Sequence, residues 1–365
     1  MQEVILAFIT AFSLTYYAIP SVILIAKEKQ LVDTPGGRHF HKQITPSLGG
    51  VGIFAGFVFS MVLWLDYQNV DGIQYLICSL LILFLIGLRD DIIPLNARVK
   101  LFAQLLAAAI LVFKSGFIID SFHGLFGVEE LSKPFAYGFT LLLYIFLINA
   151  FNLIDGINGL SGSISTIISV VAGVWFFLID NVSHSIICFA LAGAILGFLR
   201  YNILSAKIFM GDTGSTILGL MCGFISVEMM SINSNLPVSE VYRIDSIPAV
   251  IVGIYIFPIF DTVRVFILRI VRGGSPFKPD RRHIHHMLID VGLSHFQATS
   301  MLVLINLIFL LIVFSFQTIG AFYLLLVIFA LATGLTMVLL RVNDKIGSSN
   351  KGKEEAPEEA VTNEI

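Results

Sequence analysis

Long apolar blocks alternate with short polar stretches along the chain as far as residue 340. Each block holds about 16 to 24 residues, which is enough for a helix to cross the ~30 Å hydrocarbon core of a bilayer. Because lipid offers no hydrogen bonds to the backbone, continuous apolar blocks of this length predict helices. The pattern therefore predicts an all-α polytopic membrane protein with about 11 transmembrane helices. They are expected near residues 4–26, 48–65, 73–88, 100–117, 135–151, 160–179, 184–199, 215–231, 247–268, 298–316 and 319–340.

The composition agrees with that architecture. Hydrophobic residues make up 57% of the 365 positions and charged residues 13%, about half the charge of an ordinary globular domain, which excludes a soluble fold. The first block lacks a basic leader and a small-residue cleavage site, so we count it as a span and not as a signal peptide. The three cysteines lie in apolar blocks and indicate neither a disulfide framework nor a thiolate metal site. We expect a membrane domain over 1–342 and a disordered cytoplasmic tail over 343–365.

The positive charges are distributed unevenly between the two sides of this arrangement. Nineteen of the 22 Lys and Arg residues fall on one side, and the exceptions are Lys114, Lys133 and Arg243. Because positively charged loops stay in the cytoplasm, the pattern predicts an outside N-terminus and a cytoplasmic C-terminus. Most of the remaining polar residues lie on the same side, so we expect an active site at the cytoplasmic face. The span centres carry almost no charge, which counts against a transporter.

The third block ends in two adjacent carboxylates, Asp90 and Asp91. Acidic groups are unfavourable at a helix C-terminus, which attracts cations, so a positive charge must compensate them. Arg89 could pair with them locally. Alternatively, the carboxylates could bind Mg²⁺ or Mn²⁺, for which they are suitable hard ligands.

The turn between the fifth and sixth blocks combines amides, an acid and glycines over residues 149–160. One interpretation is a tight turn with Asn158 or Ser161 as the N-cap of the next helix. However, Asn152 and Asp155 are three residues apart and would share one face of a continuing helix. That face would meet the Asp90 end of the third block.

A third polar element, residues 207–215, leads into the eighth block. Asp212 or Thr213 could simply cap the helix. A helix N-terminus with flexible glycines is also an anion site. Together with Lys207 and an aromatic Phe209 that could stack on a base, the segment has the parts needed to hold a nucleoside diphosphate through a metal.

The longest cytoplasmic loop carries a basic and histidine-rich motif. No cysteine supports a zinc site there, and arginine with imidazole suits phosphate better. We expect His283 and His286 to share a helix face toward the substrate and His285 to point elsewhere. The motif consists of Arg281, Arg282, His283, His285 and His286.

Two further groups are weaker candidates. The first cytoplasmic loop contains Arg38 and His41, which could contact substrate or could only enforce topology and touch anionic headgroups. Asp261, near the inner end of the ninth block, is expected to pair with Arg264 and to support the site without joining it.

These motifs, in this order and on one side of the membrane, resemble those of the polyprenyl-phosphate N-acetylhexosamine 1-phosphate transferases. The resemblance covers roughly residues 1–340, and the eleven spans and the His-Ile-His-His form are most similar to the undecaprenyl-phosphate GlcNAc-1-phosphate branch. It implies a phosphotransferase that moves a sugar 1-phosphate from a UDP-sugar to undecaprenyl phosphate and releases UMP. The resemblance places this reaction in a bacterial inner membrane, as the first membrane step in the synthesis of a cell-surface polysaccharide such as O-antigen.

The resemblance also implies roles for individual residues. It implies an Mg²⁺ cofactor, with Mn²⁺ as a substitute, held by Asp212, Asp91 and Asn152, and a catalytic set of Asp90, Asp91, Asp212, His283 and His286. The residues matched to substrate binding are Lys100, Asn152, Asp155, Gly156, Lys207, Phe209, Arg281, Arg282, His285, Arg38 and His41. Asn158 departs from the family pattern, in which a second Asp is frequent, so no metal or base role is assigned to it. His39 also departs from a common Arg-Lys-x-His pattern, which weakens the role of that loop.

The sequence leaves several alternatives to this activity open. The second candidate is the related transferase reaction that forms lipid I, and the remote alternatives are a transporter and a non-catalytic scaffold. Direct attack by the lipid phosphate is favoured over a two-step route through an aspartyl phosphate. The expected partners are the UDP-sugar, undecaprenyl phosphate and membrane lipid; no nucleic acid is expected, and a homo-oligomer is compatible with the sequence.

Overall fold

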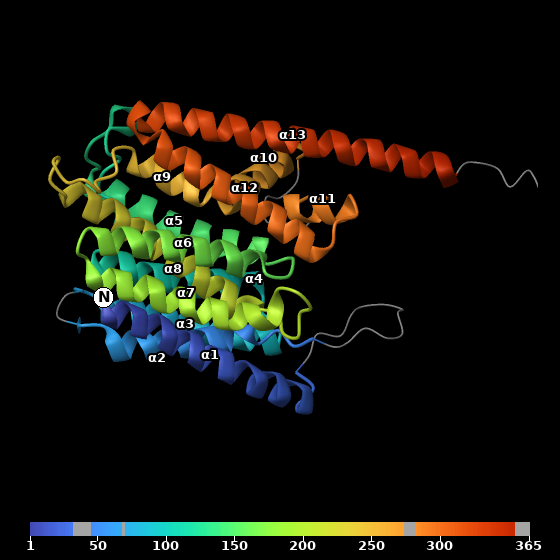
Figure 1. Ribbon diagram of the computed structural model, residues 1–365, viewed down its shortest axis with the longest axis horizontal. Coiled ribbons are helices and arrows are strands. Elements are labelled where there is room, and N and C mark those ends of the chain that lie inside the picture. Colours follow the sequence, from blue (N-terminus) through green and yellow to red (C-terminus); the bar gives the residue numbers. More distant parts are fainter. Residues whose placement is uncertain (32–44, 68–69, 274–281, 355–365) are drawn as a thin grey trace, which may run out of the picture.

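The computed structural model describes residues 1–31, 45–67, 70–273 and 282–354, and this part of the chain is helical apart from its loops and one isolated β-bridge (Figure 1). The prediction of an all-α polytopic membrane protein is confirmed. The longer helices are α1 (Gln2–Glu28), α2 (Gly49–Trp64), α3 (Ile73–Ile92), α4 (Ala97–Ile110), α5 (Lys133–Ile154), α6 (Leu160–Leu178), α7 (Val182–Asn202), α8 (Gly211–Asn235), α9 (Ile247–Ile254), α10 (Ile256–Val271), α12 (His295–Ser315) and α13 (Ala321–Glu354). A short helix, α11 (Ile284–Asp290), precedes α12.

Every predicted apolar block is helical, but the blocks differ in length. Among the described residues, eight helices are long and apolar enough to cross a membrane, and the bent pair α9 and α10 gives a ninth if it counts as one span. Helix α2 has 16 residues, and α4 has 14 before it continues as a π-helical turn over Leu111–Ser115. The total of eleven spans therefore stays a prediction.

The ninth predicted span is not a continuous helix. Helices α9 and α10 meet at Tyr255 with a bend of 81°. Pro258 has no N–H to donate to the carbonyl of Ile254, so the regular helical ladder is interrupted there. Asn306 on α12 donates its Nδ2 to that carbonyl at 3.1 Å. The break is thus stabilised by a side chain far along the sequence, which apolar block length does not reveal.

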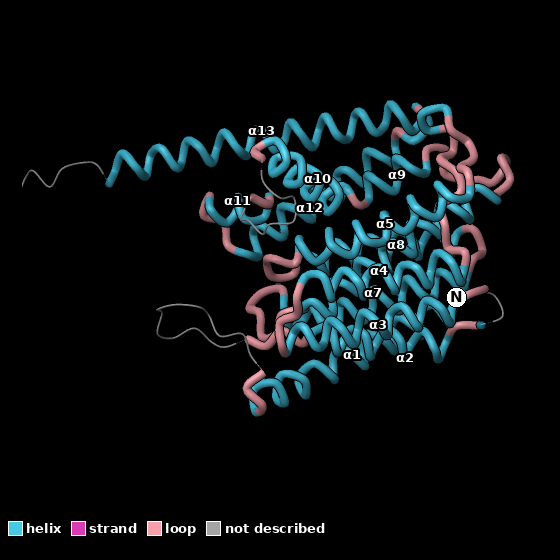
Figure 2. Tube along the Cα trace, turned by 180° about the vertical axis from the view of Figure 1, so that it is seen from behind, coloured by secondary structure: helices cyan, strands magenta, loops and turns pink. Residues whose placement is uncertain are grey.

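Helix α8 lies at the centre of the bundle and is buried over most of its length, with α2, α3, α5 and α6 packed around it (Figure 2). Glycines allow the helices to approach closely. A Cβ on Gly219 of α8 would lie 2.5 Å from Ile148 Cα on α5, and a Cβ on Gly50 of α2 would lie 2.7 Å from Gly214 Cα on α8. Close packing of this kind fixes the position of α8 and of its N-terminus.

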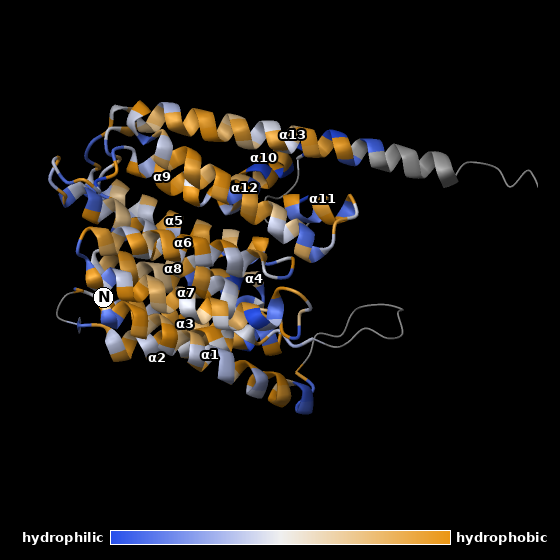
Figure 3. Cartoon of the chain, in the orientation of Figure 1, coloured by the Kyte–Doolittle hydropathy of each residue, from blue (hydrophilic) through white to orange (hydrophobic). Residues whose placement is uncertain are grey.

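Apolar residues cover the sides of the bundle, whereas polar residues gather at its two ends (Figure 3). The N-terminus lies at one end and α11 at the other (Figure 1). The C-terminal ends of α3 and α5 both contact the start of α8, at the α11 end. Helix α13 continues to Glu354, beyond the start of the tail predicted at residue 343.

Candidate active site

A carboxylate from α3 caps the N-terminus of α8. Asp91 Oδ1 accepts a hydrogen bond from the Asp212 N–H at 2.6 Å, and Asp91 Oδ2 accepts one from the Thr213 N–H at 3.1 Å and one from Thr213 Oγ1 at 2.5 Å. The first amides of a helix lack internal partners and carry partial positive charge, so a carboxylate is stabilising there. The expected local cap by Asp212 or Thr213 is therefore replaced by a long-range one. Asp91 is engaged by α8, and its assignment as a metal ligand stays a prediction.

The residue before Asp212 is in a conformation that favours glycine. Gly211 has φ +75°, and a Cβ at this position would overlap the carbonyl oxygen of Ser47 and lie 2.6 Å from Asp91 Oδ2. A larger residue would meet both strain and the capping carboxylate. Gly211 therefore permits the approach of α3 to α8.

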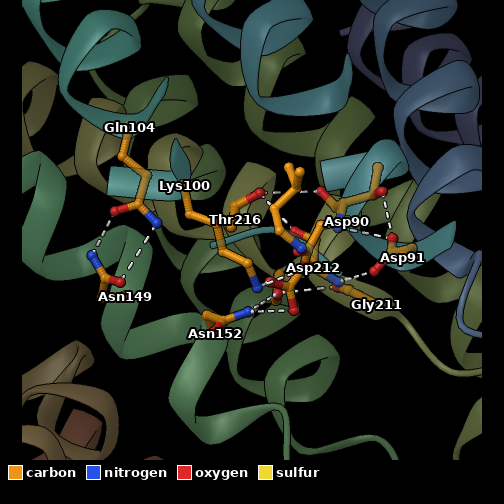
Figure 4. A network of polar contacts seen from close by, with 12 residues as sticks. Asp90, Asp91, Lys100, Gln104, Asn149, Asn152, Gly211, Asp212 and Thr216 are labelled. Carbon is orange, nitrogen blue, oxygen red and sulfur yellow. Dashed lines mark hydrogen bonds and ion pairs between the residues drawn. The ribbon is translucent and has the colours of Figure 1, made fainter. Parts of the chain in front are cut away.

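Asp90 and Asp212 share a lysine. Lys100 Nζ on α4 lies 2.5 Å from Asp90 Oδ2 and 2.7 Å from Asp212 Oδ2 (Figure 4). Asp90 Oδ1 also accepts the Leu95 N–H at 2.6 Å. The positive charge beside the acidic pair thus comes from Lys100, whereas the exposed Arg89 forms no ion pair with these acids in the described part of the chain.

Helix α5 contributes the second contact to Asp212. Asn152 Nδ2 donates to Asp212 Oδ1 at 3.1 Å and to Ser215 Oγ at 2.9 Å. Asn152 thus meets the Asp90 end around Lys100 and Asp212, as expected, but α5 ends before Asp155, so the predicted helix face with both residues does not form. The structure thus brings together Asp90, Asp91, Lys100, Asn152 and Asp212 from four helices.

The turn after α5 lies next to this centre. Helix α5 ends at Ile154, so Asp155 follows it as the C-cap. Burial raises the pKa of Asp155 well above its usual range, and the charges of Asp212 and Asp91 act in the same direction. Helix α6 begins after Gly159, whose N–H donates to Asn202 Oδ1 at 2.6 Å, so neither Asn158 nor Ser161 is its N-cap.

The histidine motif is arranged differently from the prediction. His283 precedes α11 as its N-cap and does not share a helix face with His286. Asp261 Oδ2 lies 2.8 Å from His283 Nδ1, and Asp261 Oδ1 accepts the Ile284 N–H at 3.0 Å. Arg264 Nη2 also contacts Asp261 Oδ1 at 2.8 Å, which confirms that pair. Asp261 therefore orients His283, a role that sequence spacing did not indicate.

His285 does not point away from the site. It is fully buried, and a Cβ on Gly156 would overlap its Nε2, so the imidazole packs directly on the α5–α6 turn. Burial lowers the pKa of His285 to about 3, with the neighbouring His286 as the next cause. The expectation that His285 points elsewhere is wrong, because α11 folds over Gly156 and brings the imidazole onto the α5–α6 turn.

The residues predicted to bind the UDP-sugar lie partly within the described part of the chain. Phe209 lies in the loop before α8, where its N–H donates to Pro46 O at 2.8 Å while its side chain stays exposed. Lys207 is exposed in the same loop. The predicted contributions of Arg38, His41 and Arg281 lie outside the described residues.

The groups around Asp212 have the donor chemistry of a magnesium site. The oxygens of Asp90, Asp212 and Asn152 are hard donors, and the two carboxylates already share one cation, the Lys100 ammonium. Within residues 1–31, 45–67, 70–273 and 282–354, no three His, Cys, Asp or Glu residues form a group that could hold a metal by itself. Protein sites for Mg²⁺ commonly use one or two carboxylates and complete the shell with substrate phosphates, so the residues fit the ion.

Comparisons with known proteins identify the family. Residues 73–230, which include Asp90, Asp91, Asn152 and Asp212, match the model of glycosyl transferase family 4. The chain is 32% identical over 279 residues to the undecaprenyl-phosphate alpha-N-acetylglucosaminyl 1-phosphate transferase of Escherichia coli (strain K12), covering 75% of this chain and 73% of the relative. The enzyme of the same name from Yersinia pestis is 30% identical, with 80% and 78% covered.

A third relative extends the similarity beyond these two. It is a Bacillus subtilis (strain 168) protein named "Probable undecaprenyl-phosphate N-acetylglucosaminyl 1-phosphate transferase", 33% identical over 310 residues, with 85% of this chain and 84% of the relative covered. Such identity over more than two thirds of each protein extends well beyond the short motifs. The chain is a membrane transferase that belongs to glycosyl transferase family 4.

Proposed function

We propose that the protein transfers N-acetylglucosamine 1-phosphate from UDP-GlcNAc to undecaprenyl phosphate at the cytoplasmic face of a bacterial inner membrane. The observation that carries this proposal is the gathering of Asp90, Lys100, Asn152 and Asp212 at one end of an apolar helical bundle. This site would meet a soluble nucleotide sugar and a lipid phosphate at the same membrane surface. The names of the relatives support the acceptor and the transferred group.

The reaction needs a single exchange at phosphorus. A lipid phosphate oxygen attacks the phosphorus that carries the sugar, a new P–O–P bond forms, and the bond from that phosphorus to the bridging oxygen of UDP breaks. UMP leaves with the bridging oxygen, and the product is the lipid diphosphate sugar. Because the acceptor oxygen is already largely ionised at neutral pH, the protein mainly has to orient the reactants and balance negative charge.

The two adjacent carboxylates have different roles in this proposal. We assign Asp91 to positioning, since both its oxygens accept hydrogen bonds from the start of α8. Asp90 is the better acceptor for any remaining proton of the lipid phosphate, because it does not cap α8 and its Oδ2 faces the Lys100 ammonium. That ammonium can also bind a phosphate oxygen.

The proposed cofactor is Mg²⁺, held by Asp212 and Asn152 with Asp90 beside them. When bound, the ion would neutralise charge on the diphosphate. His283, oriented by Asp261, has a buried Nε2 without a hydrogen-bond partner among the described residues, and we propose this atom as a donor to a substrate phosphate.

A donor panel tests the proposed function. Purified protein in detergent with undecaprenyl phosphate and Mg²⁺ should release UMP from UDP-GlcNAc and form a lipid-linked sugar detectable by mass spectrometry. UDP-GalNAc and UDP-MurNAc-pentapeptide serve as competing donors. Turnover with the pentapeptide donor alone would identify the lipid I reaction, and no lipid product with any donor would refute the proposal.

Phe209 is predicted to stack on the uracil ring. The Phe209→Ala variant should raise the KM for the UDP-sugar by about five- to a hundredfold, because an aromatic stacked on a base contributes ~1–3 kcal/mol. The KM for the lipid should change little. An unchanged UDP-sugar KM, measured at saturating lipid, would make Phe209 an ordinary packing residue.

The orientation in the membrane is testable with single cysteines. In a Cys78→Ser background, which removes the exposed native thiol, Val238→Cys should react with an impermeant maleimide in intact cells. Ser205→Cys, which lies in the exposed loop before α8, should react only after lysis. The reason is the excess of cations at the Ser205 end, which stays in the cytoplasm. The opposite labelling pattern would place the active site outside.

A further inference from the structure

A pair of side-chain amides joins α4 to α5 beside the acidic centre. Asn149 Nδ2 donates to Gln104 Oε1 at 2.8 Å, and Gln104 Nε2 donates back to Asn149 Oδ1 at 3.5 Å (Figure 4). Asn149 Nδ2 also donates to the Ile145 carbonyl of its own helix at 2.8 Å. Gln104 is buried, and an amide in such a setting needs a partner more than one in water does. The two amides satisfy each other across the helix interface.

The position of this pair along the helices links it to the site. Gln104 lies four residues after Lys100 on α4, and Asn149 lies three residues before Asn152 on α5. Residues at these spacings share a helix face, so the faces that carry the amide pair also carry Lys100 and Asn152. A shift of α4 along α5 that broke the pair would change the relative position of Lys100 and Asn152.

Those two residues hold opposite oxygens of one carboxylate. Lys100 Nζ contacts Asp212 Oδ2 at 2.7 Å, and Asn152 Nδ2 contacts Asp212 Oδ1 at 3.1 Å. Both contacts can form together only when α4 and α5 are in one relative register. Hydrogen bonds between helices in a bilayer contribute modestly to stability on average, so the effect of the amide pair should be seen in the geometry of the site.

We propose that Gln104 and Asn149 are positioning residues that hold α4 against α5, so that Lys100 and Asn152 reach Asp212 together. The pair does not touch the reacting groups. It acts through Lys100 and Asn152, and its effect on turnover rests on the proposed function.

Nearly isosteric variants without the amides test this role. Gln104→Met and Asn149→Leu should each lower kcat by about ten- to a hundredfold, which is the loss expected from a small misplacement of catalytic groups. The KM values for donor and lipid and the unfolding temperature should stay close to those of the wild type. The double variant Gln104→Asn with Asn149→Gln restores one amide on each helix at the same combined length and should recover most of kcat.

Ser79→Ala is the matched control. It removes another helix contact of α4, the hydrogen bond from Ser79 Oγ to Ala107 O at 2.8 Å, at a position without contact to Asp212. Its kcat should stay near the wild-type value. If the control loses as much kcat as Gln104→Met, or if the exchanged pair fails to recover activity, the amide pair has no specific positioning role.

A second measurement does not depend on activity. The rate at which an amine-reactive reagent modifies Lys100 in the folded protein can be followed by peptide mass spectrometry. The ion pairs with Asp90 and Asp212 should protect Lys100 in the wild type, and Gln104→Met and Asn149→Leu should increase the rate several-fold, whereas Ser79→Ala should not. Unchanged Lys100 reactivity in both variants would overturn the proposal. If the wild type transfers no sugar phosphate, the proposed function fails, and the Lys100 comparison still decides the positioning role.

Discussion

Replacing Asp212 with asparagine should lower kcat by about a thousandfold, the scale of loss found when a charged group that stabilises a transferring phosphate is removed. One carboxylate oxygen of Asp212 contacts Lys100 and the other accepts a hydrogen bond from Asn152. Asp212 is therefore the residue that the other polar side chains of the site contact. Asparagine keeps the shape of the side chain. The substitution also leaves the backbone N–H of residue 212, which donates a hydrogen bond to Asp91. Helix α8 should therefore keep its cap, and the protein should keep its fold.

The measurement is steady-state UMP release after EDTA treatment and return of Mg²⁺. Asp180→Asn, an exposed aspartate in the α6–α7 loop with φ +60°, is the matched control because asparagine tolerates that conformation equally well. Its turnover should match that of the wild type. Near-normal turnover of Asp212→Asn in Mg²⁺-restored protein would remove Asp212 from the metal and catalytic assignments.

Adding one methyl group at Gly211 should be almost as damaging. Gly211→Ala places a Cβ against the Ser47 carbonyl and 2.6 Å from Asp91 Oδ2, at φ +75°. Strain and overpacking together should destabilise the protein by about 2–4 kcal/mol. Displacement of Asp91 would also tilt the start of α8 and should lower kcat by about a hundredfold.

Gly138→Ala on α5 provides the comparison, because a Cβ there meets nothing within 4 Å. It should leave both the unfolding temperature and kcat near the wild-type values. Thermal unfolding in detergent separates lost stability from lost positioning. Wild-type kcat in a folded Gly211→Ala protein would show that the close approach of α3 to α8 is dispensable.

Much of the architecture can be predicted from the sequence, because each apolar block reports on its own length and polarity. The bend at Tyr255 could not be predicted in this way. Pro258 alone indicates a weakened helix, but the Ile254 carbonyl that it leaves free accepts a hydrogen bond from Asn306 Nδ2 on another helix. Local patterns describe a segment, whereas the partner of a freed backbone group is set by packing between helices.

The same limit applies to the site. Residue spacing predicted that Asn152 would meet the Asp90 end, and the family resemblance implied that Asp212, Asp91 and Asn152 would lie close together. The sequence could not distinguish the two adjacent acids, since only the contacts with α8 separate the capping Asp91 from Asp90, which pairs with Lys100.

One wrong assignment and one missed contact have a related cause. The role of His285 was misjudged because helical spacing says nothing about how α11 folds over Gly156. The amide pair was missed, although Gln104 four residues after Lys100 was a usable signal for a shared helix face.

The capping of α8 by Asp91 also bears on how the protein is made. The two partners are separated by 121 residues, and membrane helices enter the bilayer in the order of synthesis. Asp90 and Asp91 are therefore synthesised long before Asp212. Until α8 is in place, they lie at the water interface without the contacts that they make in the finished site. Their place at the very end of α3 allows this, because a carboxylate there stays hydrated until α8 arrives. Chains truncated before α8 would lack this contact, so the acidic centre is assembled late, as a product of helix packing during biogenesis.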